Sequence, residues 1–140
     1  MSLNISFQNI GLIAKPDGQK SQSEALGVLI ELLKSCKKKV FCDESVAQTL
    51  QLSSFFTLAE ISDNADLVIV VGGDGTLLHA ARNLVDSEIP VLGINLGRLG
   101  FLVDISPAEI SNLVEEVLNG NYKEDNRWFL SCQVGNQEPQ

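Results

Sequence analysis

The sequence is short of cysteine, of positive charge and of long apolar runs, and each shortage excludes a class of protein. Its three cysteines, Cys36, Cys42 and Cys132, form no CxxC pair, which argues against a disulfide framework or a zinc site. The 10 Lys and Arg against 18 Asp and Glu give a net charge of −8. This balance argues against a nucleic-acid or anionic membrane surface, because such surfaces are bound through positive fields. No run approaches the roughly 18 consecutive apolar residues of a membrane helix.

The amino-terminal segment also lacks a targeting pattern. Residues Met1–Asn9 contain no basic run followed by an apolar stretch, so we expect a cytoplasmic protein without a secretory signal. The 140 residues, 44% of them hydrophobic and 20% charged, are typical of a soluble globular domain with a real core. The negative charge does not exclude a nucleotide, since backbone N–H groups and a few local cations can hold small phosphates.

Predicted strands and helices alternate along most of the chain. The strand at 67–71 is apolar on both faces, as a central parallel strand covered by helices must be. We predict strands at 10–14, 40–42, 67–71 and 90–94, and helices from about Ser23, at 44–50, at 77–85 and from Pro107 to the residues before Gly120. This order predicts an α/β fold with an open, mostly parallel, Rossmann-like sheet flanked by helices.

The pattern changes near the end of the sequence. Trp128–Val134 is predicted as a strand, yet only a few polar residues follow it. We expect it to be the first strand of a missing β-rich carboxyl-terminal domain, which divides the chain into an α/β domain at 1–122 and the start of a second domain at 123–140. The alternative is that this strand packs on an edge of the first sheet.

A glycine-rich loop, Gly72-Gly73-Asp74-Gly75-Thr76, follows the central strand directly. Ligands bind at the carboxyl ends of strands in open α/β sheets, and glycines let phosphate oxygens approach backbone amides closely. A helix beginning near Thr76 would add unpaired N–H groups and the positive end of its dipole. Thr76 itself can donate its hydroxyl or cap that helix. The loop therefore predicts a phosphate-binding site.

Asp74 is the unexpected member of this loop, because a carboxylate repels a phosphate. It makes sense where a site needs a base for a hydroxyl nucleophile, or a ligand for a divalent metal. The plain structural alternative is an Asx-turn within a tight loop. Neither GxxxxGK[ST] nor a helix-opening GxGxxG occurs in the sequence, which excludes the P-loop NTPases and the ordinary dehydrogenases.

Two motifs together resemble one family. Val70–Thr76 looks like the signature shared by NAD kinases, diacylglycerol and sphingosine kinases, and 6-phosphofructokinases. Gly93-Ile94-Asn95-Leu96-Gly97-Arg98-Leu99-Gly100-Phe101-Leu102 is similar to a segment of NAD kinases, whereas lipid kinases carry a Gly-Thr-Gly-Asn-Asp-type stretch that this sequence lacks. The resemblance therefore points to the NAD kinases.

The resemblance implies a role for each matching position. Asp74 matches the catalytic proton acceptor for the 2′-hydroxyl of the adenosine ribose, and Gly75 matches a backbone contact to NAD. Gly72 and Gly73 would face the ATP phosphates. The remaining candidates for nucleotide binding are Thr76, Leu78, His79, Asn95, Leu99 and Phe101. Structural alternatives stay open: His79 as a satisfied imidazole, Leu99 and Phe101 as core, and Asn95 as a residue that orders its loop.

The function implied by the resemblance is transfer of the ATP γ-phosphoryl group to NAD, which gives NADP. The expected ligands are NAD, ATP and a divalent cation such as Mg²⁺, with no nucleic acid and no membrane as partners, and relatives are usually homo-oligomers. The β-rich domain of the family, with its Asn-Glu pair, is not represented, so we expect this chain alone to be inactive. The alternatives are a lipid kinase of the diacylglycerol type and a non-catalytic nucleotide-binding module.

Overall fold

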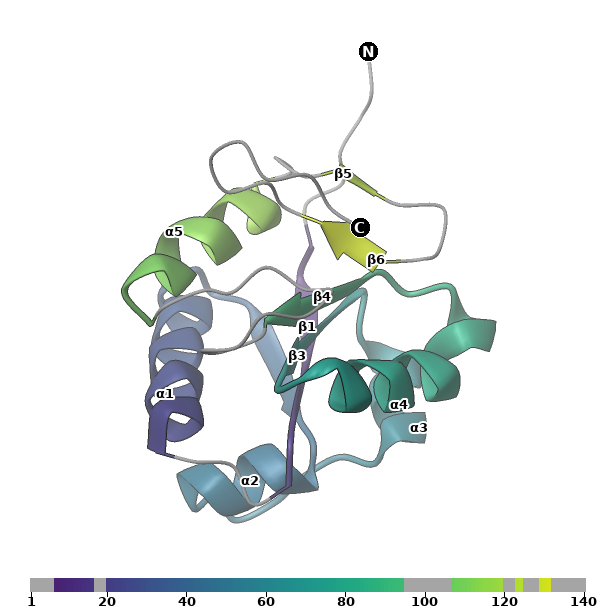
Figure 1. The fold of residues 1–140 in the computed structure, drawn as a ribbon, viewed down its shortest axis with the longest axis horizontal. Coiled ribbons are helices and arrows are strands. Elements are labelled where there is room, and N and C mark those ends of the chain that lie inside the picture. The colour runs from purple at the N-terminus through teal and green to yellow at the C-terminus, as the bar shows by residue number, and fades with distance from the viewer. Residues whose placement is uncertain (1–6, 17–19, 95–106, 120–122, 125–128, 132–140) are drawn as a thin grey trace.

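The computed structural model describes residues 7–16, 20–94, 107–119, 123–124 and 129–131 (Figure 1). The helices are α1 (Lys20–Ser35), α2 (Glu44–Leu50), α3 (Leu58–Asn64), α4 (Asp74–Leu84) and α5 (Pro107–Leu118), with a 3-10 helix η1 (Val85–Ser87) after α4. The strands are β1 (Asn9–Ala14), β2 (Lys39–Cys42), β3 (Leu67–Val71), β4 (Val91–Ile94), β5 (Lys123–Glu124) and β6 (Phe129–Ser131).

The strands form one sheet in the order β2-β1-β3-β4-β6-β5. The pairs β1–β2, β1–β3, β3–β4 and β4–β6 are parallel, and only the short β5 runs antiparallel to its neighbour. The sequence-based prediction of an open, mostly parallel α/β sheet is confirmed.

Strand β6 pairs with β4 through Val91 and Leu92, opposite Phe129 and Leu130. The strand predicted at 128–134 therefore pairs with the first sheet beside β4. This agrees with the alternative prediction, in which the strand packs on the first sheet. Trp128 and residues 132–134 lie outside the described residues. The division of the chain at residues 122 and 123 stays a prediction.

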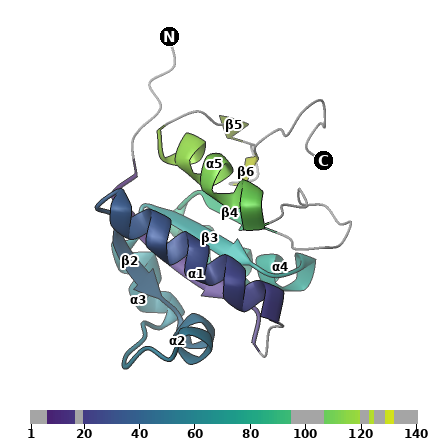
Figure 2. The same cartoon turned by 90° about the vertical axis from the view of Figure 1, so that its left-hand side faces the viewer.

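Alternation along the strands divides the core between the two faces of the sheet. Leu67, Ile69 and Val71 pack on one face with α1 and α5, while Val68 and Val70 pack on the other with α3 and α4. Figure 2 shows α1 and α5 lying together in front of the strands, with α3 and α4 behind them. The central strand is apolar on both faces because helices cover both.

The predicted helices match the observed ones except at α1, α3 and α4. Helix α2 has the predicted bounds, whereas α1 begins at Lys20 rather than about Ser23. Helix α3 was not predicted, although Thr57 and Glu60 form a capping box at its start, which is a signal readable in sequence. Helix α5 begins at the predicted Pro107 and buries an apolar face made of Ile110, Leu113, Val114, Val117 and Leu118. Gly120, before which the helix was predicted to end, lies outside the described residues.

In the part of the chain that the structure describes, no helix has both the length and the apolar character needed to cross a bilayer.

Candidate functional site

The glycine loop lies where the strand order of the sheet reverses. Strand β1 has β2 on one side and β3 on the other, and ligands of open α/β sheets bind beyond the carboxyl ends of the strands at such a switch point. Lys15 follows β1 and Gly72 follows β3 at this edge. The N–H of Lys15 donates to the Val71 carbonyl at 3.0 Å, and the N–H of Gly72 donates to the Ile94 carbonyl at 3.0 Å. The loop is therefore tied to both neighbouring strands.

Helix α4 starts earlier than the sequence predicted. The carbonyl of Gly73 accepts a hydrogen bond from the Leu77 N–H at 3.1 Å, and the helix runs from Asp74 to Leu84 rather than over 77–85. Asp74, Gly75 and Thr76 thus form the first helical turn, where backbone N–H groups have no acceptor within the helix. These amides and the helix dipole make the end of α4 favourable for an anion.

The three glycines of the loop differ in how much space an added side chain would find. A Cβ at Gly72 would lie 3.0 Å from the Thr76 Oγ1 and 3.2 Å from the Lys15 Cβ, so a side chain there would have to displace these neighbours slightly. A Cβ at Gly73 or Gly75 would meet no described atom within 4 Å. Packing among the described residues therefore does not require glycine at these two positions.

Asp74 is the first residue of α4, which begins three residues after the end of β3. Its side chain lies outside the described part of the structure, so its role as proton acceptor stays a prediction. The same is true of Asn95, Leu99 and Phe101, which fall outside the described residues. The start of their motif, Gly93-Ile94, forms the end of β4 beside the glycine loop.

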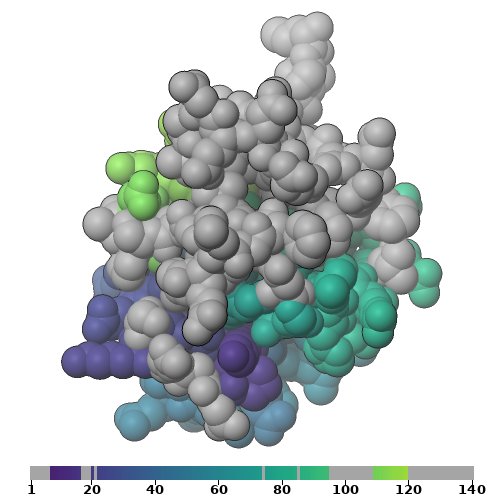
Figure 3. Space-filling model, in the orientation of Figure 1, coloured from purple at the N-terminus to yellow at the C-terminus, as the bar shows by residue number. Residues whose placement is uncertain are grey.

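Leu78 and His79 lie on the solvent side of α4. Leu78 is 55% exposed and is among the few exposed large apolar side chains in the described residues, while Leu77 and Ala80 face the sheet. His79 is exposed as well, which rules out a buried structural imidazole. In Figure 3, α4 (teal) reaches the surface of the molecule. Both side chains are therefore accessible to a ligand near the start of α4.

Lys15 also lies at this edge of the sheet, directly after β1, and no role at the site was predicted for it from the sequence. The signal that could have found it is its position directly after a parallel strand, since carboxyl ends of parallel strands share one edge.

Two titratable groups with shifted pKa values lie at the end of β2, which is separated from β3 and the glycine loop by β1. Burial, reinforced by the neighbouring Asp43 carboxylate, raises the pKa of the Cys42 thiol to about 11. Burial also raises the pKa of Asp43, although its carboxylate accepts the Val46 N–H at 2.9 Å and caps α2. The Asp43 carboxylate thus caps the helix that follows β2, and neither group is part of the glycine loop.

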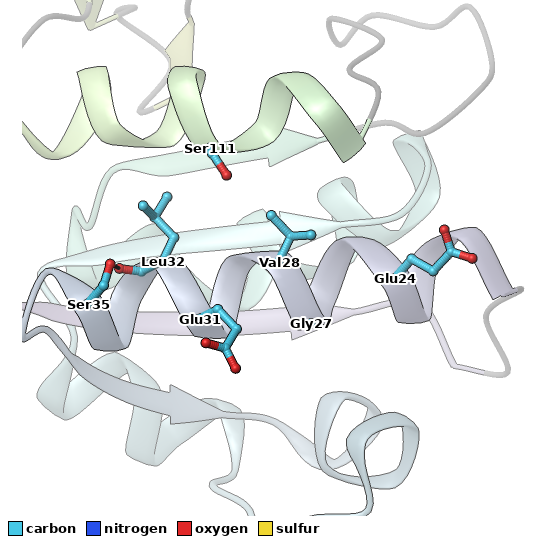
Figure 4. Close-up of a pocket in the computed structure, with 7 residues that line it drawn as sticks. All are labelled: Glu24, Gly27, Val28, Glu31, Leu32, Ser35 and Ser111. Carbon is cyan, nitrogen blue, oxygen red and sulfur yellow. Dashed lines mark hydrogen bonds between the residues drawn. The ribbon is translucent and has the colours of Figure 1, made fainter.

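A surface pocket lies between α1 and α5 (Figure 4). Residues of α1, including Glu24, Val28 and Glu31, line it together with Ser111 of α5. It occupies the helix layer opposite α4 and contains no residue of either motif, so we do not assign it to the candidate site.

The sequence and fold resemble those of known kinases. Residues 10–122 match the family model described as the ATP-NAD kinase N-terminal domain. The chain is 44% identical to an NAD kinase of Acinetobacter baylyi over 131 residues, covering 92% of this chain and 42% of the relative. It is 40% identical to an NAD kinase of Colwellia psychrerythraea, covering 91% of this chain and 44% of the relative.

A solved structure shares the fold. The crystal structure of yeast NADH kinase complexed with NADH matches with a TM-score of 0.65 and 23% identity, over 84% of this chain and 37% of that chain. The chain spans less than half the length of these relatives. Since the family model matches most of the sequence, the chain belongs to the family of ATP-NAD kinase N-terminal domains.

Proposed function

We propose that the intact protein is an NAD kinase, which transfers the γ-phosphoryl group of ATP to the adenosine 2′-hydroxyl of NAD and releases NADP and ADP. The observation that carries the proposal is the glycine loop at the switch point of the sheet, with the amino end of α4 behind it. The family membership and the NAD kinases at 40–44% identity support the same reaction.

The reaction forms a bond between the 2′-oxygen and the γ-phosphorus, and it breaks the bond from that phosphorus to the β,γ-bridging oxygen. In the proposed mechanism the Asp74 carboxylate accepts the proton of the 2′-hydroxyl. The amides of Gly73 and of the first turn of α4 hold phosphate oxygens and stabilise charge on the transferring group. Such pre-positioned donors act most strongly where water is excluded.

ATP would be bound as its complex with a divalent cation, and we propose that this cation is Mg²⁺. In the described part of the chain, no group of three or more His, Cys, Asp or Glu side chains is placed to hold a metal ion. We treat the cation as part of the MgATP substrate, and no step of the proposed mechanism passes through an ion held by the protein alone.

The acceptor pocket follows from the family resemblance. We propose that Gly75 contacts NAD through its backbone and that Leu78, Leu99 and Phe101 line the adenine pocket. Thr76, His79 and Asn95 would contribute polar contacts. The yeast relative binds NADH, so NADH belongs beside NAD among the acceptors to be tested. We also propose a cytoplasmic homo-oligomer, in keeping with other members of the family.

The Asp74→Asn variant of the intact protein tests the assigned proton acceptor. We expect the melting temperature to change little and kcat to fall by about 10²–10⁴-fold, the range for loss of a general base. Asp86→Asn is the matched control, because Asp86 is an exposed carboxylate in η1, beyond the other end of α4. Turnover of Asp74→Asn close to that of the control would exclude the proposed role.

A further inference from the structure

The backbone of Lys15 is held from two directions. Its N–H donates to the Val71 carbonyl at 3.0 Å, which joins the ends of β1 and β3. Its carbonyl accepts a hydrogen bond from the Gln22 Nε2 at 2.8 Å. The start of the Lys15 side chain is therefore fixed relative to the sheet.

The Lys15 side chain begins beside the glycine loop. Its Cβ lies 3.2 Å from the position that a Cβ would take at Gly72, and the Thr76 Oγ1 lies 3.0 Å from the same point. Lys15 is exposed, so its flexible stem can carry the ammonium group over the glycine loop. A compact ammonium group of this kind is a common partner of phosphate.

Gln22 has an unusual environment for a polar side chain. Gln22 is 5% exposed, and it is the one polar residue that is buried among the residues the structure describes. Burying an amide is costly unless it is hydrogen-bonded, and Gln22 uses its amide to hold the carbonyl of Lys15. Helix α1 thereby fixes the end of β1 at the edge where the glycine loop lies.

We propose that Lys15 binds the polyphosphate chain of ATP at the glycine loop, and that Gln22 is the positioning residue that holds Lys15 there. The proposal rests on the proposed function, because it takes ATP as the ligand of this edge of the sheet. It adds a side-chain cation to a site otherwise built from backbone amides and a helix dipole. It also assigns Lys15 to the phosphoryl donor rather than to the acceptor NAD.

Steady-state kinetics on the intact protein test the proposal, with ATP and NAD varied separately. Lys15→Ala should raise the KM for ATP about 10-fold or more, as expected for loss of a charge-assisted contact, and leave the KM for NAD within about twofold. Lys15→Arg should recover much of the loss. Gln22→Leu should raise the KM for ATP by a smaller factor. The control is Lys20→Ala, which removes an exposed lysine at the start of α1.

The outcomes separate the roles. A Lys15→Ala variant that behaves like Lys20→Ala, or that raises only the KM for NAD, overturns the assignment of Lys15. A change in kcat alone, without a change in the KM for ATP, also overturns it. A Gln22→Leu variant that melts at a lower temperature but keeps its KM for ATP would leave Gln22 a purely structural role. If the wild type makes no NADP, the proposed function fails, and calorimetric titration of MgATP into the wild type and Lys15→Ala still decides whether Lys15 binds it.

Discussion

The Gly75→Ala substitution can separate the effect of Gly75 on protein stability from its proposed role in ligand binding. It lies in the first turn of α4, and a Cβ added there would meet no described atom within 4 Å. Alanine is favoured over glycine in helices by about 0.5–1 kcal/mol. We therefore expect Gly75→Ala to stabilise the intact protein, raising its melting temperature by about 1–4 °C.

The same substitution should impair turnover. The new methyl group would extend into the space above the loop by about 1.5 Å, the length of a C–C bond. A ligand that contacts the Gly75 backbone would have to move by a comparable distance, and a misplacement of about 1 Å can cost on the order of 10²-fold in rate. We expect kcat/KM for NAD to fall by about 10²-fold while stability rises.

Gly27→Ala is the matched control for this experiment. Gly27 lies in the interior of α1, and its added Cβ also meets no described atom within 4 Å. It should give the same stabilisation with unchanged kinetics, measured by thermal unfolding and by NADP formation. If Gly75→Ala keeps a kcat/KM within about twofold of Gly27→Ala, the open space at Gly75 is not reserved for a ligand, and the reasoning fails.

Two further predictions concern the rest of the fold. Gly11→Ala should destabilise the protein by about 1–3 kcal/mol in urea unfolding, because its Cβ would lie 2.5 Å from the buried Ile61 Cγ2 between β1 and α3; an unchanged midpoint would contradict this packing. The pKa of the Cys42 thiol is raised from 9.0 to about 11. At pH 8 its thiolate fraction should therefore be about 100-fold smaller than that of an ordinary cysteine. Iodoacetamide should accordingly label Cys42 slowly in the folded protein. Between pH 9 and 11 the native thiol keeps a proton that the unfolded chain has lost, so stability should fall by about 2–3 kcal/mol as pH rises through this window, a loss that Cys42→Ala should abolish.

Local pattern was sufficient for the central elements of the fold. The run Leu67–Val71 is apolar on both faces and is followed by glycine. The predicted bounds of this strand are therefore the same as the observed bounds of β3. Helix α3 was missed because it is short and Ile61 is its only buried residue, which leaves too little apolar periodicity to detect. Helix α4 was started too late because Gly73-Asp74-Gly75 was interpreted as loop, whereas Asp74 and Gly75 are in the first helical turn.

Long-range pairing limited the prediction of the site. The glycine loop could be placed at a strand end from sequence, because Gly72 directly follows the strand. The proximity of Lys15 to Gly72 depends on β1 and β3 being neighbours, and no local pattern specifies which strands pair. The same limit applies to β6, whose sequence indicates a strand but not its pairing with β4.

The most direct test of the proposed function follows the position of the transferred phosphate. The intact protein is incubated with NAD and ATP labelled in the γ-phosphate, and the product is located by phosphorus NMR and mass spectrometry. The proposed function predicts label on the 2′-hydroxyl of the adenosine ribose, as NADP. Binding of both nucleotides without transfer, or label on a diacylglycerol with none on NAD, would contradict it.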